Sequence, residues 1–103
     1  MSYESVLDAL GDPTRRRILE ALRPGPLPVG AVAAGLPVSR PAVSKHLRVL
    51  EGAGLVTYEA SGTRRLYRID GDGLAALRAW IDGFWGEVLG GFAAYVSEQE
   101  GDD

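Results

Sequence analysis

A chain of 103 residues, 46% of them hydrophobic, has room for one domain with a modest core, which favours one domain over two. The absence of cysteine excludes disulfides, thiolate zinc sites and cysteine nucleophiles. No stretch is long and apolar enough to span a membrane, and the N-terminal residues lack the basic and apolar regions of a signal peptide. We therefore expect a soluble, cytoplasmic protein with no membrane partner.

The net charge of −3 is unevenly distributed along the chain. Residues 39–69 contain six Lys and Arg against two Glu, so this segment carries +4 and the remainder carries −7. Because local charge matters more than net charge for phosphate binding, this segment is a candidate nucleic-acid contact. An ordinary solvated surface explains the charge equally well. The arginine run at 15–17 is interpreted as a solvated helix face, with a phosphate contact by one of the three as the alternative.

The N-terminal part predicts two helices. Apolar residues at helical spacing predict a first helix over residues 3–10 that stops at Gly11. Asp12 suits the N-cap of a second helix, and Pro13 suits its first position because the N–H there needs no acceptor. Pro-Gly-Pro at 24–26 ends this second helix.

Residues 28–53 have the pattern of a helix-turn-helix. A short apolar helix is broken by glycine and proline, and Ser39 suits the N-cap of the next helix. In that helix Val43, Leu47 and Leu50 form a narrow apolar stripe, and the opposite side carries hydroxyl and basic groups. This is the arrangement in which the second helix lies in the major groove of DNA.

Several side chains of this second helix are candidate DNA contacts. The small hydroxyls of Ser39 and Ser44 let the backbone approach closely, and Arg40 is placed to contact O6 and N7 of guanine. A bidentate contact of that kind discriminates bases by about 1–3 kcal/mol. His46 borders the apolar stripe, so a packed histidine with a local hydrogen bond competes with a DNA contact. A metal site is not expected, because one histidine and no cysteine leave only carboxylates as further ligands.

Residues 55–69 predict a β-hairpin beside that helix. The strands are expected at 55–60 and 64–69, with Ser-Gly-Thr at the turn. Two strands are marginal alone, so the hairpin must pack on the helices. Arg64 and Arg65 at its tip are placed to enter or straddle a minor groove, which makes the hairpin a wing. The alternative is an exposed hairpin whose arginines serve only solubility.

The last predicted helix, residues 72–98, is apolar around more of its circumference than one small domain covers. It therefore needs a second surface, which predicts a dimer. Glycines at 83, 86, 90 and 91 each cost roughly 1 kcal/mol in a helix, and they either permit close helix approach or bend the helix. A pocket for a hydrophobic effector among the aromatic residues is less favoured than packing. Residues 99–103 are expected to form an acidic, disordered tail.

The helix order, the sequence SRPAVSKHLRVLEGAGLV at 39–56 and the arginine-bearing hairpin resemble the ArsR/SmtB family of winged helix-turn-helix repressors over nearly the whole chain. The expected fold is mostly α with a small β-hairpin, in the order α-α-α-α-β-β-α, as one domain over residues 1–98. The resemblance implies a homodimer that binds double-stranded DNA sequence-specifically, at an inverted repeat, and usually represses its own operon.

The resemblance also implies which residues make the contacts. The expected DNA contacts are Ser39, Arg40, Pro41, Ser44, Lys45, His46, Arg48, Thr63, Arg64 and Arg65. The expected dimer contacts are Tyr3, Val6, Leu77, Trp80, Ile81, Phe84, Trp85, Val88 and Phe92.

Metal-sensing members of that family use cysteines before the recognition helix, or histidine and carboxylates on the last helix. This chain has neither pattern, so it is similar to the branch without recognisable metal ligands. We expect no cofactor and no metal, and the effector stays unknown.

Two other functions compete with this expectation. A winged helix that docks its basic face onto an acidic protein is the main alternative to sequence-specific DNA binding. An enzyme has little support, because Ser44 and His46 are too close on one helix to form a nucleophile and base pair.

Overall fold

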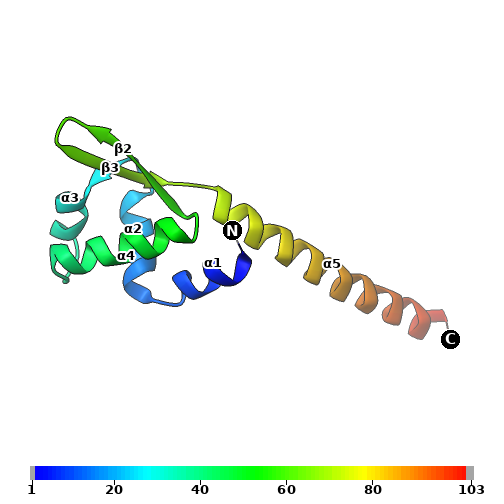
Figure 1. Cartoon of the computed structure of the whole chain (residues 1–103). Helices are drawn as coiled ribbons and strands as arrows, with labels where there is room; N and C mark the ends of the chain where they lie inside the picture. Colours follow the sequence, from blue (N-terminus) through cyan, green and yellow to red (C-terminus); the bar gives the residue numbers. More distant parts are fainter. Residues whose placement is uncertain (1, 102–103) are drawn as a thin grey trace.

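The computed structural model describes residues 2–101, which form a small globular part and one long projecting helix (Figure 1). The molecule measures 70 × 25 × 22 Å because the last helix extends beyond the globular part. The elements in chain order are α1 (Tyr3–Leu10), α2 (Pro13–Leu22), β1 (Leu27–Pro28), α3 (Val29–Ala34), α4 (Arg40–Gly52), β2 (Val56–Ser61), β3 (Arg64–Ile69) and α5 (Asp72–Gly101).

Side-chain caps start the helices where the sequence predicts them. The carboxylate of Asp12 accepts hydrogen bonds from the backbone N–H groups of Thr14 at 2.8 Å and Arg15 at 3.1 Å. The bond from Arg15 is the main cause that lowers the pKa of Asp12 below its ordinary value of 3.8. The stability this cap supplies is therefore present above that value and is lost as the pH falls through the lowered pKa. Ser39 caps α4 in the same way, accepting from the backbone N–H of Ala42 at 3.2 Å.

One apolar core joins the helices and the sheet. It draws on α1 to α4, on the turn after α4 and on the inner ends of the strands, but on α5 only through Leu77. No polar or charged side chain in the described part of the chain is buried. The core residues are Val6, Ala9, Ile18, Leu22, Val32, Val43, Leu47, Leu50, Ala53, Leu55, Val56, Tyr67 and Leu77. Because α5 contributes so little, the globular part has its core without the rest of that helix.

The sheet has three strands in the order β1-β3-β2, one more than the sequence predicts. Leu27 pairs with Tyr67 and Pro28 with Leu66, so β1 attaches the inner half of the hairpin to the start of α3. A two-residue strand that contains proline has no alternating pattern, which is why the sequence did not reveal it.

The hairpin turn is tighter than the predicted Ser-Gly-Thr loop. Ser61 pairs directly with Arg64, which leaves Gly62 and Thr63 as the two central residues. Gly62 has a φ of +63°, the left-handed conformation that a two-residue turn of this kind needs at its first central position. The strand β2 accordingly extends to Ser61 rather than ending at residue 60.

Helix α5 runs to Gly101, so its predicted end at residue 98 is wrong by three residues. Glutamate and glutamine favour helix and no proline follows, so nothing local stops it there. Residues 102–103 of the predicted acidic tail lie outside the described residues. A Cβ at Gly83, Gly86, Gly90 or Gly91 would meet nothing within 4 Å, so these glycines serve no close approach within the chain. In the part of the chain that is described, α5 included, no helix combines the length and hydropathy needed to cross a bilayer.

Candidate nucleic-acid interface

The outer face of α4 is polar and basic, as the sequence predicts. The side chains of Val43, Leu47 and Leu50 are completely buried on the inner face. On the outer face Ser44 and His46 are half-buried. The remaining predicted contacts of this segment are exposed, namely Ser39, Arg40, Pro41, Lys45 and Arg48. The structure therefore presents one continuous set of donors and cations along the first three turns of the helix.

The wing carries the second set of predicted contacts. Thr63, Arg64 and Arg65 are all exposed at its tip. The guanidinium of Arg65 lies over the ring of Tyr58, 4.6 Å from its centre, which restrains the side chain in the free protein. Arg68, further down β3, lies 3.5 Å from the carboxylate of Glu59 and is therefore less available to an anion.

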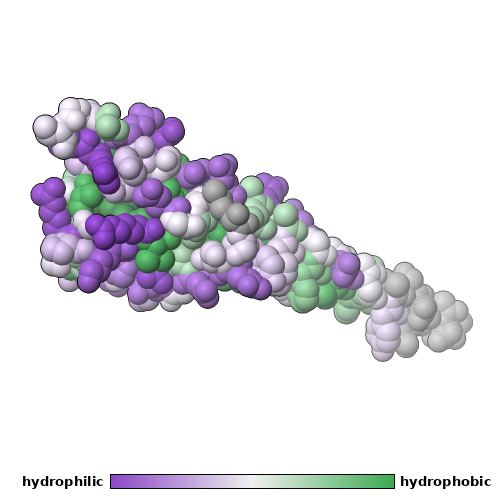
Figure 2. Space-filling view, in the orientation of Figure 1, coloured by the Kyte–Doolittle hydropathy of each residue, from purple (hydrophilic) through white to green (hydrophobic). Residues whose placement is uncertain are grey.

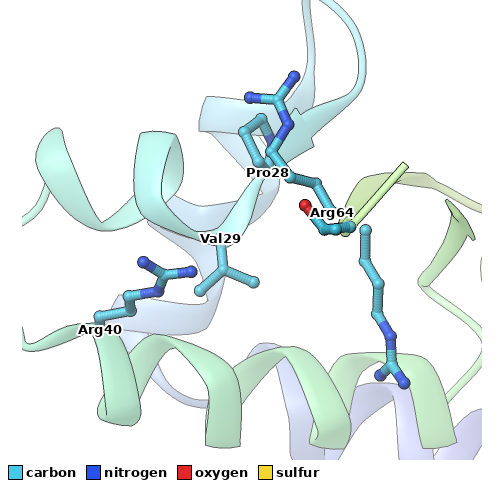
Figure 3. A pocket seen from close by; sticks show the side chains of 6 residues that line it. Pro28, Val29, Arg40 and Arg64 are labelled. Carbon is cyan, nitrogen blue, oxygen red and sulfur yellow. The ribbon is translucent and has the colours of Figure 1, made fainter. Parts of the chain in front are cut away.

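A hollow of about 250 Å³ brings the two sets together (Figure 3). Arg40 at the first position of α4 and the three wing residues border it, although 23 positions separate Arg40 from Thr63 in the sequence. The residues that line it are Pro28, Val29, Arg40, Thr63, Arg64 and Arg65. The lining contains no carboxylate. The sequence alone gave no signal for the contribution of Pro28 and Val29, because it depends on the unpredicted strand β1.

The arginine run at 15–17 is not simply a solvated face. Arg15 is half-buried, and it donates through Nε to the carbonyl of Ala9 at 2.7 Å and through Nη2 to that of Asp8 at 3.2 Å. Arg16 donates to the carbonyl of Leu10 at 2.6 Å. These carbonyls lie in the last turn of α1, where that of Asp8 also accepts from the backbone N–H of Gly11 at 3.2 Å, so the two arginines and Gly11 together cap its C-terminus.

His46 belongs to the same contact. Its Nδ1 lies 3.5 Å from Nη1 of Arg15, and its side chain is half-buried between α4 and α2. This matches the local hydrogen bond that the sequence leaves open for His46. Through Arg15, the end of α1 is linked to the middle of α4.

We expect Arg15→Ala to lower the free energy of unfolding by about 2 kcal/mol, because hydrogen bonds from a charged donor to the carbonyls at the end of α1 are lost. Arg17→Ala, at an exposed position of the same run, is the control and should change it by less than about 0.5 kcal/mol. Urea unfolding followed by circular dichroism measures both variants. Equal stabilities of the two variants would contradict the capping role.

The other functional surface is the aromatic face of α5. Tyr3 of α1 stacks on Trp80 at 4.9 Å, Trp80 on Phe84 at 5.4 Å, and Trp85 meets Phe84 edge-on at 5.4 Å. Figure 2 shows apolar surface continuing along α5 beyond the globular part. The predicted contacts Trp80, Ile81, Phe84, Trp85, Val88 and Phe92 are between 37% and 64% exposed, as are the unpredicted Leu89 and Tyr95.

Two predicted dimer contacts, Val6 and Leu77, pack in the core of their own chain. Val6 is completely buried in the core of its own chain, so it has no surface left for a partner. Leu77 is 9% exposed and holds the start of α5 onto the same core. Helical spacing shows which residues share a face, but it does not show whether that face packs within the chain or against a second copy. Tyr3, half-buried against Trp80, stays at the edge of the exposed aromatic face.

Within the part of the chain that the structure describes, no three His, Asp or Glu side chains come together as metal ligands would.

Comparison with known proteins identifies the fold and the family. A model of a helix-turn-helix domain matches residues 10–59. The HTH-type transcriptional regulator Rv2034 of Mycobacterium tuberculosis is 56% identical over 102 residues, which span 99% of this chain and 94% of that protein. An ArsR-like transcriptional regulator from Rhodococcus sp. RHA1 has a structure that superposes with a TM-score of 0.81 at 34% identity, over 90% of this chain and 88% of that one.

The chain belongs to the ArsR/SmtB family. A further ArsR-type structure is the homodimeric winged helix-turn-helix DNA-binding domain of Mb0332 from Mycobacterium bovis, described as a possible ArsR-family regulator. It is 33% identical with a TM-score of 0.65, over 82% of this chain and 78% of that one. The resemblance read from the sequence and the winged helix-turn-helix fold are both confirmed. Members of the ArsR/SmtB family are DNA-binding transcriptional regulators.

Proposed function

We propose that this ArsR/SmtB protein is a homodimeric, sequence-specific repressor that binds an inverted-repeat operator in the cytoplasm. The observation that carries the proposal is the outer face of α4, where exposed Arg40, Lys45 and Arg48 lie beside the arginines of the wing tip. A helix with its side chains has the width of the major groove, and a flanking hairpin reaches the backbone or the minor groove next to it.

The aromatic face of α5 supports the dimer. Large apolar side chains that are 37–64% exposed along one helix form a surface that a soluble monomer rarely leaves uncovered. A second copy is the partner we propose, because the family includes a homodimeric domain of the same fold. In a two-fold dimer the same face of each chain meets, and the two α4 helices then lie roughly 34 Å apart, one turn of DNA.

Repression follows from occupancy of a promoter by the dimer. Release requires an effector that binds better to a dimer whose α4 helices no longer match the spacing of the operator. A ligand with equal affinity for both conformations of the dimer does not change their populations. The chemical nature of that effector is not indicated by either surface.

Selection from a pool of random duplexes tests the proposal directly. The purified protein is expected to enrich a palindromic sequence with half-sites one helical turn apart. It should also retard a fragment of its own promoter. Enrichment of no sequence would contradict sequence-specific binding, and would favour a winged helix that uses its basic face to bind an acidic protein.

Lys45→Ala is expected to weaken binding to all duplexes by the same factor, about three- to tenfold at 0.15 M salt. The exposed ammonium of Lys45 is a point charge that suits a phosphate better than a base edge. Fluorescence anisotropy with the selected duplex and with a mixed-sequence duplex measures the two affinities. A loss confined to the selected duplex would show that Lys45 reads a base instead.

A further inference from the structure

The hollow between α4 and the wing is lined by basic and hydroxyl side chains together with Pro28 and Val29. Three arginines border it, from the first residue of α4 and from the tip of the wing, and Thr63 adds a hydroxyl. In the described part of the chain, the arginines with a carboxylate partner are Arg23, Arg68 and Arg78. The arginines of the hollow therefore lie outside those ion pairs.

We propose that this hollow binds one backbone phosphate of the DNA duplex, and that Arg40 is a phosphate contact rather than a base-reading residue. The inference rests on the proposed DNA binding and specifies how one part of that interface works. It replaces the contact to guanine that the sequence suggests for Arg40.

The chemistry of the lining selects an anion. A guanidinium has five N–H donors and no acceptor, so the ligand must supply acceptors from several directions. A guanine edge offers two acceptors and satisfies a single arginine, which would leave the other two arginines of the lining without an anion. A phosphate offers acceptor oxygens on several sides together with the negative charge that three neighbouring cations need.

The position of Arg40 also favours the backbone over the bases. Its Nη1 lies 3.7 Å from the point that a Cβ on Gly30 would occupy, so the guanidinium rests over the first turn of α3. Figure 3 shows the side chain directed toward Val29, while Arg64 enters from the wing beside Pro28. A guanidinium held over α3 lies at the side of α4 that meets the wing, where the edge of a groove and its phosphates pass.

Arg65 makes part of the site rigid before DNA arrives. Because its guanidinium lies 4.6 Å from the centre of the Tyr58 ring, this side chain loses less conformational freedom on binding than a free arginine does. Tyr58 is in turn fixed by Tyr67, whose ring centre is 5.4 Å away and which is buried. Arg65 is thus connected to the core through Tyr58 and the buried Tyr67.

The test uses the full-length dimer, the selected duplex and a mixed-sequence duplex of the same length. Arg40→Ala is expected to weaken both affinities equally, by about tenfold. It should also make the plot of the logarithm of the association constant against the logarithm of the salt concentration less steep, by about 1 for each protomer. Random-site selection with this variant should return the same sequence as the parent protein. A selected sequence that changes at one position, with unchanged affinity for the mixed duplex, would show base reading and overturn the inference.

Two further variants sharpen the result. Arg40→Lys keeps the charge but loses the planar fork, so a phosphate contact retains the salt slope and most of the affinity, whereas a bidentate guanine contact loses its specificity. Arg78→Ala is the matched control, because it removes one exposed arginine from α5, which points away from α4 and the wing. In a preparation confirmed as dimeric, Arg78→Ala should leave the salt dependence of the DNA affinity unchanged. If Arg78→Ala made this dependence less steep by as much as Arg40→Ala does, the proposal would be contradicted.

The remaining outcomes separate this inference from the function on which it rests. If the parent protein bound no duplex in a salt-dependent manner, the DNA-binding function and this inference would fall together. If it bound DNA but Arg40→Ala kept the full slope, only the phosphate contact would be wrong. The last outcome concerns a soluble ligand. If the protein bound pyrophosphate saturably with a dissociation constant below about 1 mM, and Arg40→Ala abolished this binding, the hollow would be a site for a soluble ligand and the DNA assignment would be overturned.

Discussion

Phe84→Asp is expected to convert the protein from a dimer to a monomer. Phe84 lies at the centre of the exposed aromatic face and is 46% exposed, with its ring stacked on Trp80 and edge-on to Trp85 of the same helix. Truncation of a central aromatic residue costs a protein interface about 2–4 kcal/mol, and a two-fold dimer contains the residue twice. With the further cost of burying a carboxylate, the dimer dissociation constant should rise by at least about 10³-fold.

The fold should survive this change. Of the α5 residues whose burial the structure describes, only Leu77 belongs to the core, so a charge at position 84 disturbs no packing within the core. Ala79→Asp is the matched control: it places the same charge five residues earlier, on the side of α5 away from the aromatic face, at an exposed position. Sedimentation velocity should show a monomer for Phe84→Asp and a dimer for Ala79→Asp.

The same pair of variants tests how the dimer contributes to DNA binding. A monomer engages one half-site, so it loses the gain in effective concentration that links the second recognition helix to the first. Phe84→Asp should therefore bind the selected inverted repeat no more tightly than a duplex with a single half-site. A Phe84→Asp variant that sediments as a dimer would contradict the assignment of this face.

Gly73→Ala is expected to destabilise the fold by about 2–4 kcal/mol. Helix α5 begins where it crosses the turn after α4, and the N–H of Gly73 donates to the carbonyl of Gly54 at 2.9 Å. A Cβ on Gly73 would collide with the carbonyl oxygen of Ala53 and lie 2.9 Å from the carbonyl carbon and oxygen of Gly54. Because these are backbone atoms in a buried turn, α5 must move away and the hydrogen bond must lengthen.

Gly71→Ala provides the control for that variant. A Cβ on Gly71, two residues earlier, would meet nothing within 4 Å, so this substitution should change stability by less than about 0.5 kcal/mol. Urea unfolding of both variants at equal protein concentration, well above the dimer dissociation constant, gives the comparison. Equal urea midpoints for Gly71→Ala and Gly73→Ala would show that the start of α5 can move away from the turn at 53–54 without lowering the free energy of unfolding.

The parts of this structure that the sequence predicts correctly depend on neighbours along the chain. Asp12 and Ser39 cap helices because a cap bonds N–H groups two or three residues ahead. The inner stripe of α4 follows from helical periodicity alone, and all three of its predicted residues are fully buried. The position of the hairpin turn follows in the same way, because small residues separate two segments rich in β-branched and aromatic residues.

The features that the sequence did not reveal depend on contacts between distant segments. Arg15 was grouped with its neighbours as a solvated residue because its acceptors belong to another helix. The need for glycine at position 73 comes from the turn at 53–54, which has no link to it in the sequence pattern. The hollow of the candidate interface needs β1, and a two-residue strand has no periodicity to detect.

Helix α5 contacts the globular part near its start, at Gly73, Leu77 and Trp80, and this has a mechanical consequence. A helix of 30 residues is about 45 Å long, and these contacts lie near one end of it. A change of about 10° in the angle at that pivot carries the far tip through about 8 Å on the same helical geometry. Conversely, when the α5 helices of two copies pair along their length in the proposed dimer, a small change in their crossing angle moves each α4 helix relative to the DNA.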